Sequence, residues 1–437
     1  MSRVMKDSGI PWIGEIPEEW ECHQFRRIFV IKKIIANTLG YDVLSVTQSG
    51  IKVKDLTKNE GQIAQDYSKY QLVDINDYVM NHMDLITGFV DCSKQNGVTS
   101  PDYRVFRALD ESQISLLYYL RIFQTCYKER IFYHLGQGVS GMGRWRLPAE
   151  QLKLFVLPKP PIAEQEAIAE FLDRKCGELD KMVALQEQVI EELKAYKQSI
   201  ITEAVTKGLN PDTPMKPSGI DWIGNIPAHW RTPKMNQISN TITDFVASGS
   251  FESLRVNVPY LDSPDYAMLV RTTDLSGSAR SEKRVFISKH SYDFLSNSNL
   301  FGGEIVLPNI GAVGDVYLVP KNLYSRMSLA PNAIMLKTRY FDKFYYYYFL
   351  GDAGKLSIVS LCQSTAQPKF NKTQLKSIRV LLPPLSEQRE IADYLDRKCA
   401  DIDALIALKQ QKIEDLREYK KSLIYEYVTG KKQTLRG

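Results

Sequence analysis

The sequence predicts an α+β protein: two domains of mixed strands and helices joined by two long helices that form an antiparallel coiled coil, with an internal pseudo-twofold repeat. Two phrases that each occur twice in the 437 residues indicate an internal duplication. The longer phrase has the periodicity of a helix, whereas the stretches between the phrases are rich in β-branched and aromatic residues. The chain therefore reads as two related halves, each with one mixed domain and one long helix.

The first phrase is short and rich in tryptophan. Residues 8–20 read SGIPWIGEIPEEW and residues 218–230 read SGIDWIGNIPAHW, so most positions match at an offset of 210 residues. Because the phrase is kept while the surrounding sequence diverges, we interpret it as structural scaffold.

The second phrase is long and predicts a helix in each half. Residues 160–208 and 383–431 match at an offset of 223 residues, and both contain LDRKC. Each begins with two prolines, which are tolerated at a helix start but not inside it, and no other proline follows. Gly208 and Gly430 are expected to end the two helices.

Apolar residues recur at steps of three and four along both predicted helices, which is typical of a coiled coil. Gln186 and Lys409 interrupt the pattern at matching places, and some forty residues make a rod of roughly 60 Å. We expect the two helices to pair; the alternative is two separate helical linkers, each docked on its own domain. The stripes consist of Ile168, Leu172, Leu179, Met182, Leu185, Val189, Leu193, Tyr196 and Ile200, and of Ile391, Leu395, Ile402, Leu405, Leu408, Leu416, Tyr419 and Leu423.

The stretches between the phrases predict two mixed domains. Strand-like runs occur at 41–48, 77–83, 103–109, 267–273 and 304–310, and apolar helical runs at 114–135 and 342–359. Both stretches place their parts in a similar order, and QLK occurs at 151–153 and again at 374–376. We interpret the two domains as diverged copies of one fold.

Composition and motifs exclude several classes of protein. Neither a secretory leader nor an apolar run of membrane-spanning length is visible, and the six cysteines have no zinc-like spacing, so we expect a cytoplasmic protein with reduced thiols and no membrane association. Adenine-methyltransferase and phosphate-loop motifs are missing, and the five histidines are scattered. We therefore expect no catalytic residue, no metal and no cofactor in this chain.

The doubled WIG-IP--W phrase and the doubled PP--EQ--IA--LDRK helix, with two unlike domains between them, resemble the specificity subunit of a type I restriction–modification system. The resemblance implies that each variable domain is a target recognition domain reading one half of a bipartite, asymmetric double-stranded DNA target. It implies that the coiled coil sets the half-site separation and that the repeats bind two modification subunits, which methylate adenine at N6. Restriction subunits would join them, and S-adenosylmethionine, ATP and Mg would act in these partners.

Net charge agrees with DNA binding by the variable domains. Residues 1–160 carry 20 basic against 18 acidic residues, or +2, and residues 217–383 carry 18 against 12, or +6. Residues 161–216 carry 7 against 11, or −4, so the variable domains are the cationic parts. The expected domains are the N-terminal scaffold repeat 1–20, recognition domain 21–159, central helical repeat 160–208, linker and second scaffold repeat 209–230, recognition domain 231–382, distal helical repeat 383–431 and tail 432–437.

The candidate scaffold and partner-binding residues belong to the two repeated phrases. The tryptophans are expected to anchor packing, with stacking on DNA as the alternative, and the acidic residues lie where a helix N-terminus favours negative charge. The candidates are Trp12, Trp20, Trp222, Trp230, Glu164, Gln165, Glu387 and Gln388.

The candidate DNA-binding residues are loop-like Arg, Lys, Asn and Gln, because Arg or Lys pairs with guanine and Asn or Gln with adenine in direct readout. Each could instead be a solvated or structural polar residue. The candidates are Gln48, Lys52, Asn81, Gln137, Arg144 and Arg146 in the first domain, and Arg271, Arg280, Asn309, Gln363, Gln367 and Lys369 in the second.

Two other functions compete with this interpretation. A standalone sequence-specific DNA-binding protein would leave the repeated partner surfaces unexplained. An enzyme with a fused readout domain would need catalytic motifs that the sequence lacks.

Overall fold

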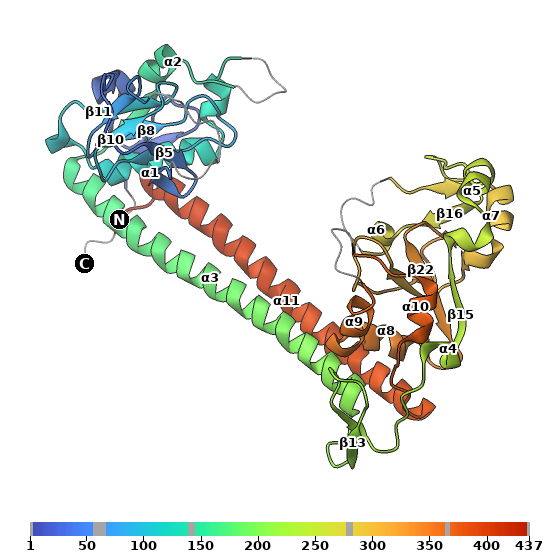
Figure 1. Ribbon diagram of the computed structural model, residues 1–437. Helices are drawn as coiled ribbons and strands as arrows, with labels where there is room; N and C mark the ends of the chain where they lie inside the picture. The colour runs from blue at the N-terminus through green and yellow to red at the C-terminus, as the bar shows by residue number, and fades with distance from the viewer. Residues whose placement is uncertain (1–2, 56–66, 139–144, 277–282, 363–367, 435–437) are drawn as a thin grey trace. The chain divides into compact units, whose positions relative to one another are not determined.

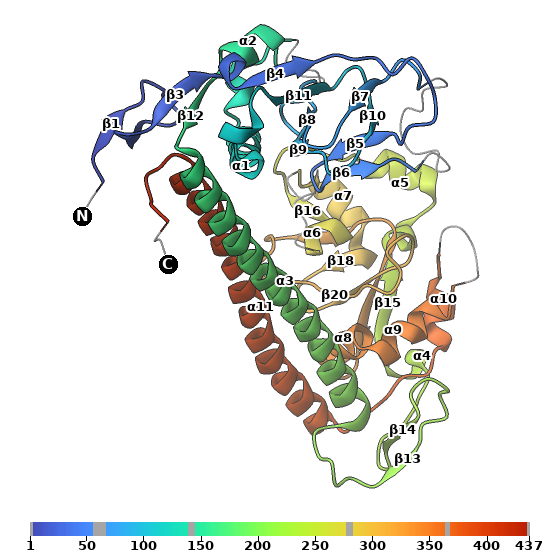
Figure 2. The same cartoon turned by 90° about the vertical axis from the view of Figure 1, so that its left-hand side faces the viewer.

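The computed structural model describes residues 3–55, 67–138, 145–276, 283–362 and 368–434. The chain forms two compact units, one of residues Met1–Glu187 with Gln411–Gly437 and the other of Gln188–Gln410. Each unit contains one mixed domain, one Trp-rich phrase and part of each long helix (Figures 1 and 2).

The Trp-rich phrases form matching hairpins. In the first unit β1 (Met5–Asp7) pairs with β2 (Glu15–Pro17), and in the second β13 (Met215–Pro217) pairs with β14 (Asn225–Pro227). Lys6 lies opposite Ile16 and Lys216 opposite Ile226, so the register is the same in both copies.

The first mixed domain is built on a four-stranded antiparallel sheet. Its strand order is β4 (Phe29–Lys32), β11 (Arg104–Ala108), β8 (Tyr78–Met80) and β9 (Val90–Cys92). Residues of α1 (Leu116–Lys128), among them Tyr119 and Phe123, pack with Phe29 and Phe106 from one face of this sheet. A smaller cluster around Val79 and Val105 joins the other face to the hairpin of β5 (Leu44–Thr47) and β6 (Gly50–Val53) and to the pair β7 (Gln71–Val73) and β10 (Gly97–Thr99).

The second mixed domain has the same frame, a four-stranded sheet with a helix on one face, but a different layer covers the other face of the sheet. Its first sheet has the order β15 (Ser239–Asp244), β22 (Ala333–Thr338), β19 (Ile305–Pro308) and β20 (Tyr317–Leu318), with α8 (Asp342–Leu350) in the core on one face. Val306 and Met335 on the other face join a cluster with a second sheet. That sheet has the order β17 (Phe286–Ile287), β16 (Ala267–Val270), β21 (Met327–Leu329) and β18 (Asn299–Leu300), and β16 runs parallel to β21.

Shorter elements complete the two domains. In the first unit they are β3 (Glu21–Gln24), which pairs with β12 (Val156–Lys159), α2 (Ala149–Leu154), and the 3-10 helices η1 (Phe25–Arg27), η2 (Glu111–Gln113) and η3 (Phe132–Leu135). In the second unit they are α4 (Met235–Ile238), α5 (Phe251–Asn257), α6 (Thr272–Leu275), α7 (Lys289–Phe294), α9 (Asp352–Val359), α10 (Lys372–Ser377), η4 (Phe245–Ser248) and η6 (Ser296–Ser298).

The two long helices are α3 (Ile162–Lys207, 46 residues) and α11 (Leu385–Val428, 44 residues). They pack together and run antiparallel in each unit (Figures 1 and 2). In the first unit Lys420 Nζ lies 2.6 Å from Asp180 Oδ1. In the second, Lys197 Nζ lies 2.6 Å from Asp403 Oδ2. These contacts confirm the pairing that the repeated periodicity predicts.

The predicted helix ends are also confirmed. Gly208 and Gly430 follow α3 and α11 with φ of 76° and 73°, the left-handed conformation that commonly closes a helix. A side chain at Gly430 would also collide with Pro17 and Trp20 of the Trp-rich hairpin. Glycine is therefore required here by both the backbone angle and the close approach.

The prediction of which apolar residues form the contact between the two long helices, here called the seam, is only partly correct. Leu179, Ile402 and Leu416 are buried, but six of the predicted stripe residues lie 46–64 % exposed. Ile190 and Ile413 are buried in their place. Both helices have two neighbouring apolar stripes, and the sequence pattern merged them into one. The six exposed residues are Met182, Leu185, Tyr196, Leu405, Leu408 and Tyr419.

The predicted aromatic helix at 342–359 is also interrupted. It consists of α8 and α9, which Gly351 separates. The backbone N–H of Asp352 donates to Thr202 Oγ1 at 3.0 Å, so the break lets α9 start against α3.

Among the described residues, no helix is long and apolar enough to cross a membrane.

Candidate nucleic-acid interface and partner-docking scaffold

A buried tryptophan joins the first hairpin to the start of α3. Trp20 is fully buried, and its Nε1 donates a hydrogen bond of 2.9 Å to Glu164 Oε2. Arg3 donates to the same carboxylate, with Nη2 at 2.8 Å from Oε2. Because Glu164 lies in the first turn of α3, its charge also faces the positive end of the helix dipole.

The second unit repeats this contact with different neighbours. Trp230 is fully buried, and its Nε1 lies 2.9 Å from Glu387 Oε2 in the first turn of α11. His229 Nε2 lies 2.6 Å from the other oxygen of that carboxylate, where the first unit has Arg3. The Trp–Glu pair is therefore the part of the contact that both copies keep.

A buried glutamine follows each glutamate and ties the long helix to its mixed domain. Gln165 Nε2 donates to the Pro160 carbonyl at 2.8 Å, and its Oε1 accepts from the backbone N–H of Ser115, just before α1. Gln388 likewise donates to the Pro383 carbonyl at 2.8 Å and accepts from Phe341, just before α8. Both glutamines are fully buried, so their contacts are internal to the scaffold.

The other two tryptophans differ between the copies. Trp12 stacks on Phe155 with ring centroids 5.8 Å apart. Trp222 is 44 % exposed, and its Nε1 donates to the Ala353 carbonyl at 3.1 Å. A role of the eight scaffold candidates in partner binding stays a prediction.

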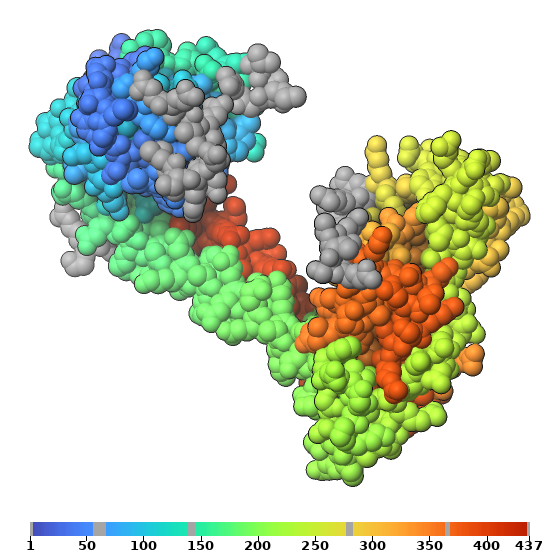
Figure 3. Space-filling view, in the orientation of Figure 1, coloured from blue at the N-terminus to red at the C-terminus, as the bar shows by residue number. Residues whose placement is uncertain are grey.

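The exposed apolar residues of the long helices form matching pairs. Met182 and Leu405, Leu185 and Leu408, and Tyr196 and Tyr419 are each 223 residues apart, the offset of the repeat. In the first unit, Met182 and Tyr419 line a groove of about 440 Å³ between α3 and α11. Much of α3 is open to solvent on the face that Figure 3 shows. The repeated phrase thus carries two equivalent apolar surfaces, which the sequence pattern assigned to the seam.

In the first domain, a rim of backbone contacts follows strand β8. The backbone N–H of Leu147 donates to the His82 carbonyl at 2.9 Å, and buried Arg104 donates to the Leu147 carbonyl at 2.9 Å. Gln137 and Arg146 pair through their backbones at 2.8 and 3.0 Å. Arg146 is therefore held by its main chain while its side chain is exposed.

The second domain has the same rim after strand β19. The backbone N–H of Phe370 donates to the Asn309 carbonyl at 3.1 Å, and Asn309 Nδ2 donates to the Phe370 carbonyl at 3.2 Å. Ile310 and Lys369 form a bridge beside this contact. Lys369 is exposed, as Arg146 is.

The predicted DNA-binding residues fall into three groups. Exposed side chains belong to Gln48, Lys52, Gln137, Arg146 and Lys369, of which Gln48 also donates from Nε2 to the Thr87 carbonyl at 3.3 Å. Three other candidates make contacts within the protein. Asn81 Oδ1 accepts from the backbone N–H of Met83, and Asn309 Nδ2 donates to the Phe370 carbonyl. Arg271 Nη2 lies 2.8 Å from Asp274 Oδ1. Arg144, Arg280, Gln363 and Gln367 lie outside the described residues. The structure thus brings together Gln137 and Arg146 at one rim and Asn309 and Lys369 at the other.

A histidine in the first rim has an altered pKa. Burial, together with the positive charges of Arg104 and Arg146, lowers the pKa of His82 from 6.5 to about 4. Its Nδ1 is buried and has no hydrogen-bond partner among the described residues. His82 is therefore neutral near pH 7 and adds no charge to the rim.

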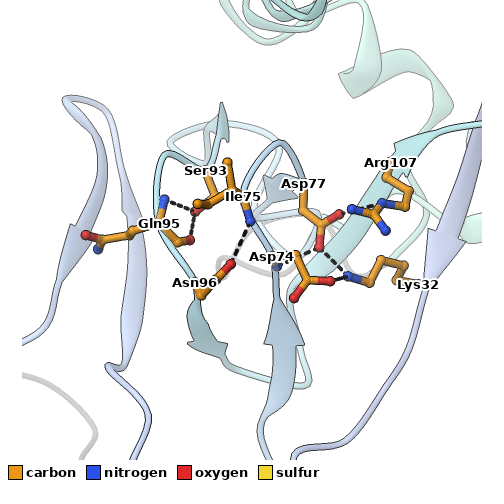
Figure 4. Close-up of polar contacts among 8 residues, drawn as sticks. All are labelled: Lys32, Asp74, Ile75, Asp77, Ser93, Gln95, Asn96 and Arg107. Carbon is orange, nitrogen blue, oxygen red and sulfur yellow. Dashed lines mark hydrogen bonds and ion pairs between the residues drawn. The ribbon is translucent and has the colours of Figure 1, made fainter. Parts of the chain in front are cut away.

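Buried acids that the sequence analysis missed precede the central strands. In the first domain, Asp77 is fully buried and pairs with Lys32 and with Arg107, whose Nε lies 3.1 Å from Oδ1 (Figure 4). In the second domain, Glu304 is 1 % exposed and lies 3.7 Å from Lys337 Nζ. The strand registers make Asp77 equivalent to Glu304 and Arg107 to Lys337. Arg107 and Lys337 are paired with these acids, so we assign them a structural role within the sheets.

No group of three or more potential metal ligands occurs in the part of the chain that the structure describes.

Comparison with known proteins defines the class. The family model of the type I restriction modification DNA specificity domain matches the chain twice, over residues 24–195 and 241–418. The chain belongs to this family, so it is the DNA specificity subunit, the non-catalytic component, of a type I restriction–modification system.

Individual relatives agree with this assignment. The chain is 24 % identical to a protein named for the MjaX specificity subunit of Methanocaldococcus jannaschii, over 96 % of this chain and 95 % of that one. It is 26 % identical to the type I restriction enzyme EcoBI specificity subunit of Escherichia coli, over 64 % of this chain and 60 % of that one.

Two solved structures share the fold. One, from a study of complex assembly and conformational transition of the type I R-M system, has a TM-score of 0.69 at 13 % identity and covers 94 % of this chain and 98 % of its own. The other, the HsdS subunit from Thermoanaerobacter tengcongensis, has a TM-score of 0.53 at 13 % identity and covers 96 % and 98 %.

Proposed function

We propose that each mixed domain reads one half of a bipartite, asymmetric DNA target, that α3 and α11 set the spacing, and that the repeated scaffold docks two modification subunits. These subunits would carry S-adenosylmethionine and methylate adenine at N6, and restriction subunits using ATP and Mg would join them. The observation that carries this proposal is the contrast between the two domains: one frame, with different layers on its outer face. Two different layers on one frame are suited to reading two different sequences.

Docking of two identical partners is supported by the repeated apolar surfaces. Exposed clusters of large apolar side chains on a soluble protein mark interaction sites. Here Met182 with Tyr419 in the first unit, and Leu405 with Tyr196 in the second, are equivalent pairs under the repeat. Two copies of one partner could therefore bind equivalent apolar surfaces, one in each unit, although the two recognition domains differ.

Spacing by the long helices is supported by their continuity. Both helices run without interruption for more than forty residues, and charged pairs link them in both units. DNA advances about 34 Å per turn, so the distance between two half-sites is a matter of geometry. A stiff helix pair is a suitable device for fixing that distance.

The proposal is tested by methylation assays with and without the partner. The purified chain alone should bind its target and methylate nothing, whereas the chain with the modification subunit and S-adenosylmethionine should methylate adenine in both half-sites. Methylation by the lone chain would support the fused-enzyme alternative. Specific binding by the lone chain that the modification subunit neither joins nor alters would support a standalone DNA-binding protein.

A further inference from the structure

Arg146 and Lys369 occupy equivalent positions in the two recognition domains. They are 223 residues apart, which is the offset of the long repeat. Each precedes the residue whose N–H donates to the segment after the central strand, Leu147 to His82 and Phe370 to Asn309. Each is followed, three residues later, by the first residue of a short helix, α2 or α10. Sequence offset, backbone bonding and helix position therefore all give the same equivalence.

Both side chains are basic and exposed. Neither Arg146 nor Lys369 forms an ion pair with any residue that the structure describes. Arg107 and Lys337, a basic pair that the two sheets keep, face buried acids and so have a structural use. Among the residues that the structure describes, no buried acid explains why both copies have a basic residue at the positions of Arg146 and Lys369.

The surroundings of these two residues differ between the domains. Trp145 precedes Arg146 and donates from Nε1 to the Tyr133 carbonyl at 2.6 Å, whereas Pro368 precedes Lys369. His82 in one rim is replaced by Asn309 in the other. Positive charge at the rim is thus kept while the neighbouring residues change.

The two domains keep a basic residue at this position although they are expected to read different sequences. This suggests a contact with the part of DNA that does not vary with sequence. Side chains that read bases change with the half-site sequence, whereas the phosphate backbone is the same at every site. The backbone is fixed at both positions, by the main-chain bonds of Arg146 with Gln137 and by those of Phe370, next to Lys369, with Asn309. A fixed backbone suits a contact that sets the position of each domain on the duplex.

We propose that Arg146 and Lys369 are equivalent phosphate-binding residues that position the two recognition domains on DNA and do not read bases. This inference rests on the proposed function, since it requires that both domains bind DNA. It changes the role expected for both residues from base recognition to backbone contact.

The test is the salt dependence of DNA binding by the complete complex with modification subunits. Arg146→Gln and Lys369→Gln should each weaken binding to target and non-target duplexes by the same factor. Each should reduce the slope of log K against log salt by about 0.9, the value for one phosphate contact. The double variant should lose about twice that, and the methylated sequence should stay the same.

Lys153→Gln is the matched control. Lys153 is also basic in both copies, with Lys376 as its equivalent, but it pairs with Glu150 at 2.8 Å. This variant removes the same charge from the same domain and should leave the slope unchanged. An equal loss of slope in the control would show that net charge, not a defined contact, is responsible and would overturn the proposal.

Two further outcomes would contradict the inference. If Arg146→Gln relaxed the methylated sequence at one base position, Arg146 would be a base reader. If both variants kept the wild-type slope, neither residue would contact phosphate. A wild-type complex that shows no preference for any sequence would instead refute the proposed function, so the two failures are distinguishable.

Discussion

The two recognition domains are alike where they meet the scaffold and unlike on the opposite face of the sheet. On the inner face, α1 and α8 are tied to the long helices through Gln165 and Gln388. On the outer face, Val79 and Val105 are covered by two short strand pairs in the first domain, and Val306 and Met335 by a second sheet in the other. The inner face is constrained by the helices it packs on. The outer layer need only cover apolar residues, so it can diverge and still fold.

The largest predicted effect concerns the buried acids that both frames keep. Asp77→Ala should destabilise the first unit by about 3–5 kcal/mol, because Lys32, whose side chain is 8 % exposed, keeps only the exposed Asp74 as a partner and the Asp74 N–H loses its acceptor. Glu304→Ala should destabilise the second unit by only about 1–3 kcal/mol, because Lys337 is 44 % exposed and can be solvated. Hydrogen exchange of strands β8 and β19 in the purified chain measures each unit separately.

Asp77→Asn is a control for this comparison, since it keeps an acceptor for the Asp74 N–H while it removes the charge. Its effect should lie between those of wild type and Asp77→Ala. Equal protection loss at β8 and β19 in the two alanine variants would show that the two acids contribute alike.

The second prediction separates spacing from reading. Asp180 pairs with Lys420 and Glu187 with Arg417, so Ala184 lies opposite the turn that contains Leu416. Four residues inserted after both Ala184 and Leu416 should lengthen the pair by about 6 Å at 1.5 Å per residue. With base pairs about 3.4 Å apart, the preferred spacer should grow by one or two base pairs while both half-sites stay the same. Methylation of a library with fixed half-sites and variable spacers measures this.

A seven-residue insertion at both positions is the matched control, because it preserves the heptad phase that four residues disturb. It should add about 10 Å, or about three base pairs, with less loss of stability. Activity at the original spacing in both variants would mean that α3 and α11 do not set the distance.

The smallest predicted effect concerns pH and the two rims. The pKa of His82 is about 4, below its ordinary 6.5, so protons bind the unfolded chain more tightly than the folded one. The first unit should therefore lose stability as pH falls from about 6.5 towards 4. His82→Asn introduces the residue that the second rim has at Asn309, and it should lose less stability over this window. Urea unfolding midpoints at both ends of the window measure the difference. An identical pH dependence in wild type and variant would show that His82 does not cause it.

Local signals predicted the scaffold well. Gly208 and Gly430 end their helices as the sequence indicates, and the antiparallel pairing follows from the repeated periodicity. The seam was harder, because Met182 and Val183 are neighbouring apolar residues and only packing decides which one faces the partner helix. Because Val183 packs inward, Met182 and the other residues of its stripe are left exposed.

Non-local pairing explains most of what the sequence could not predict. Met268 pairs with Met327 in the parallel strands β16 and β21, and no local pattern connects residues so far apart. Among the candidate DNA contacts, Arg271 is engaged by Asp274, three residues later, which was a readable signal. Asn309 contacts Phe370, which is distant in sequence, so only the fold could reveal its internal role.

Independent reading by the two domains is tested most directly by exchanging one of them. Residues 21–159 would be replaced with the first recognition domain of another family member, and the methylated sites of a cell carrying the chimera and its modification subunit would be sequenced. We predict that one half-site changes while the other half-site and the spacer stay the same. A change in both half-sites would contradict the account, because the two domains would then not read DNA independently.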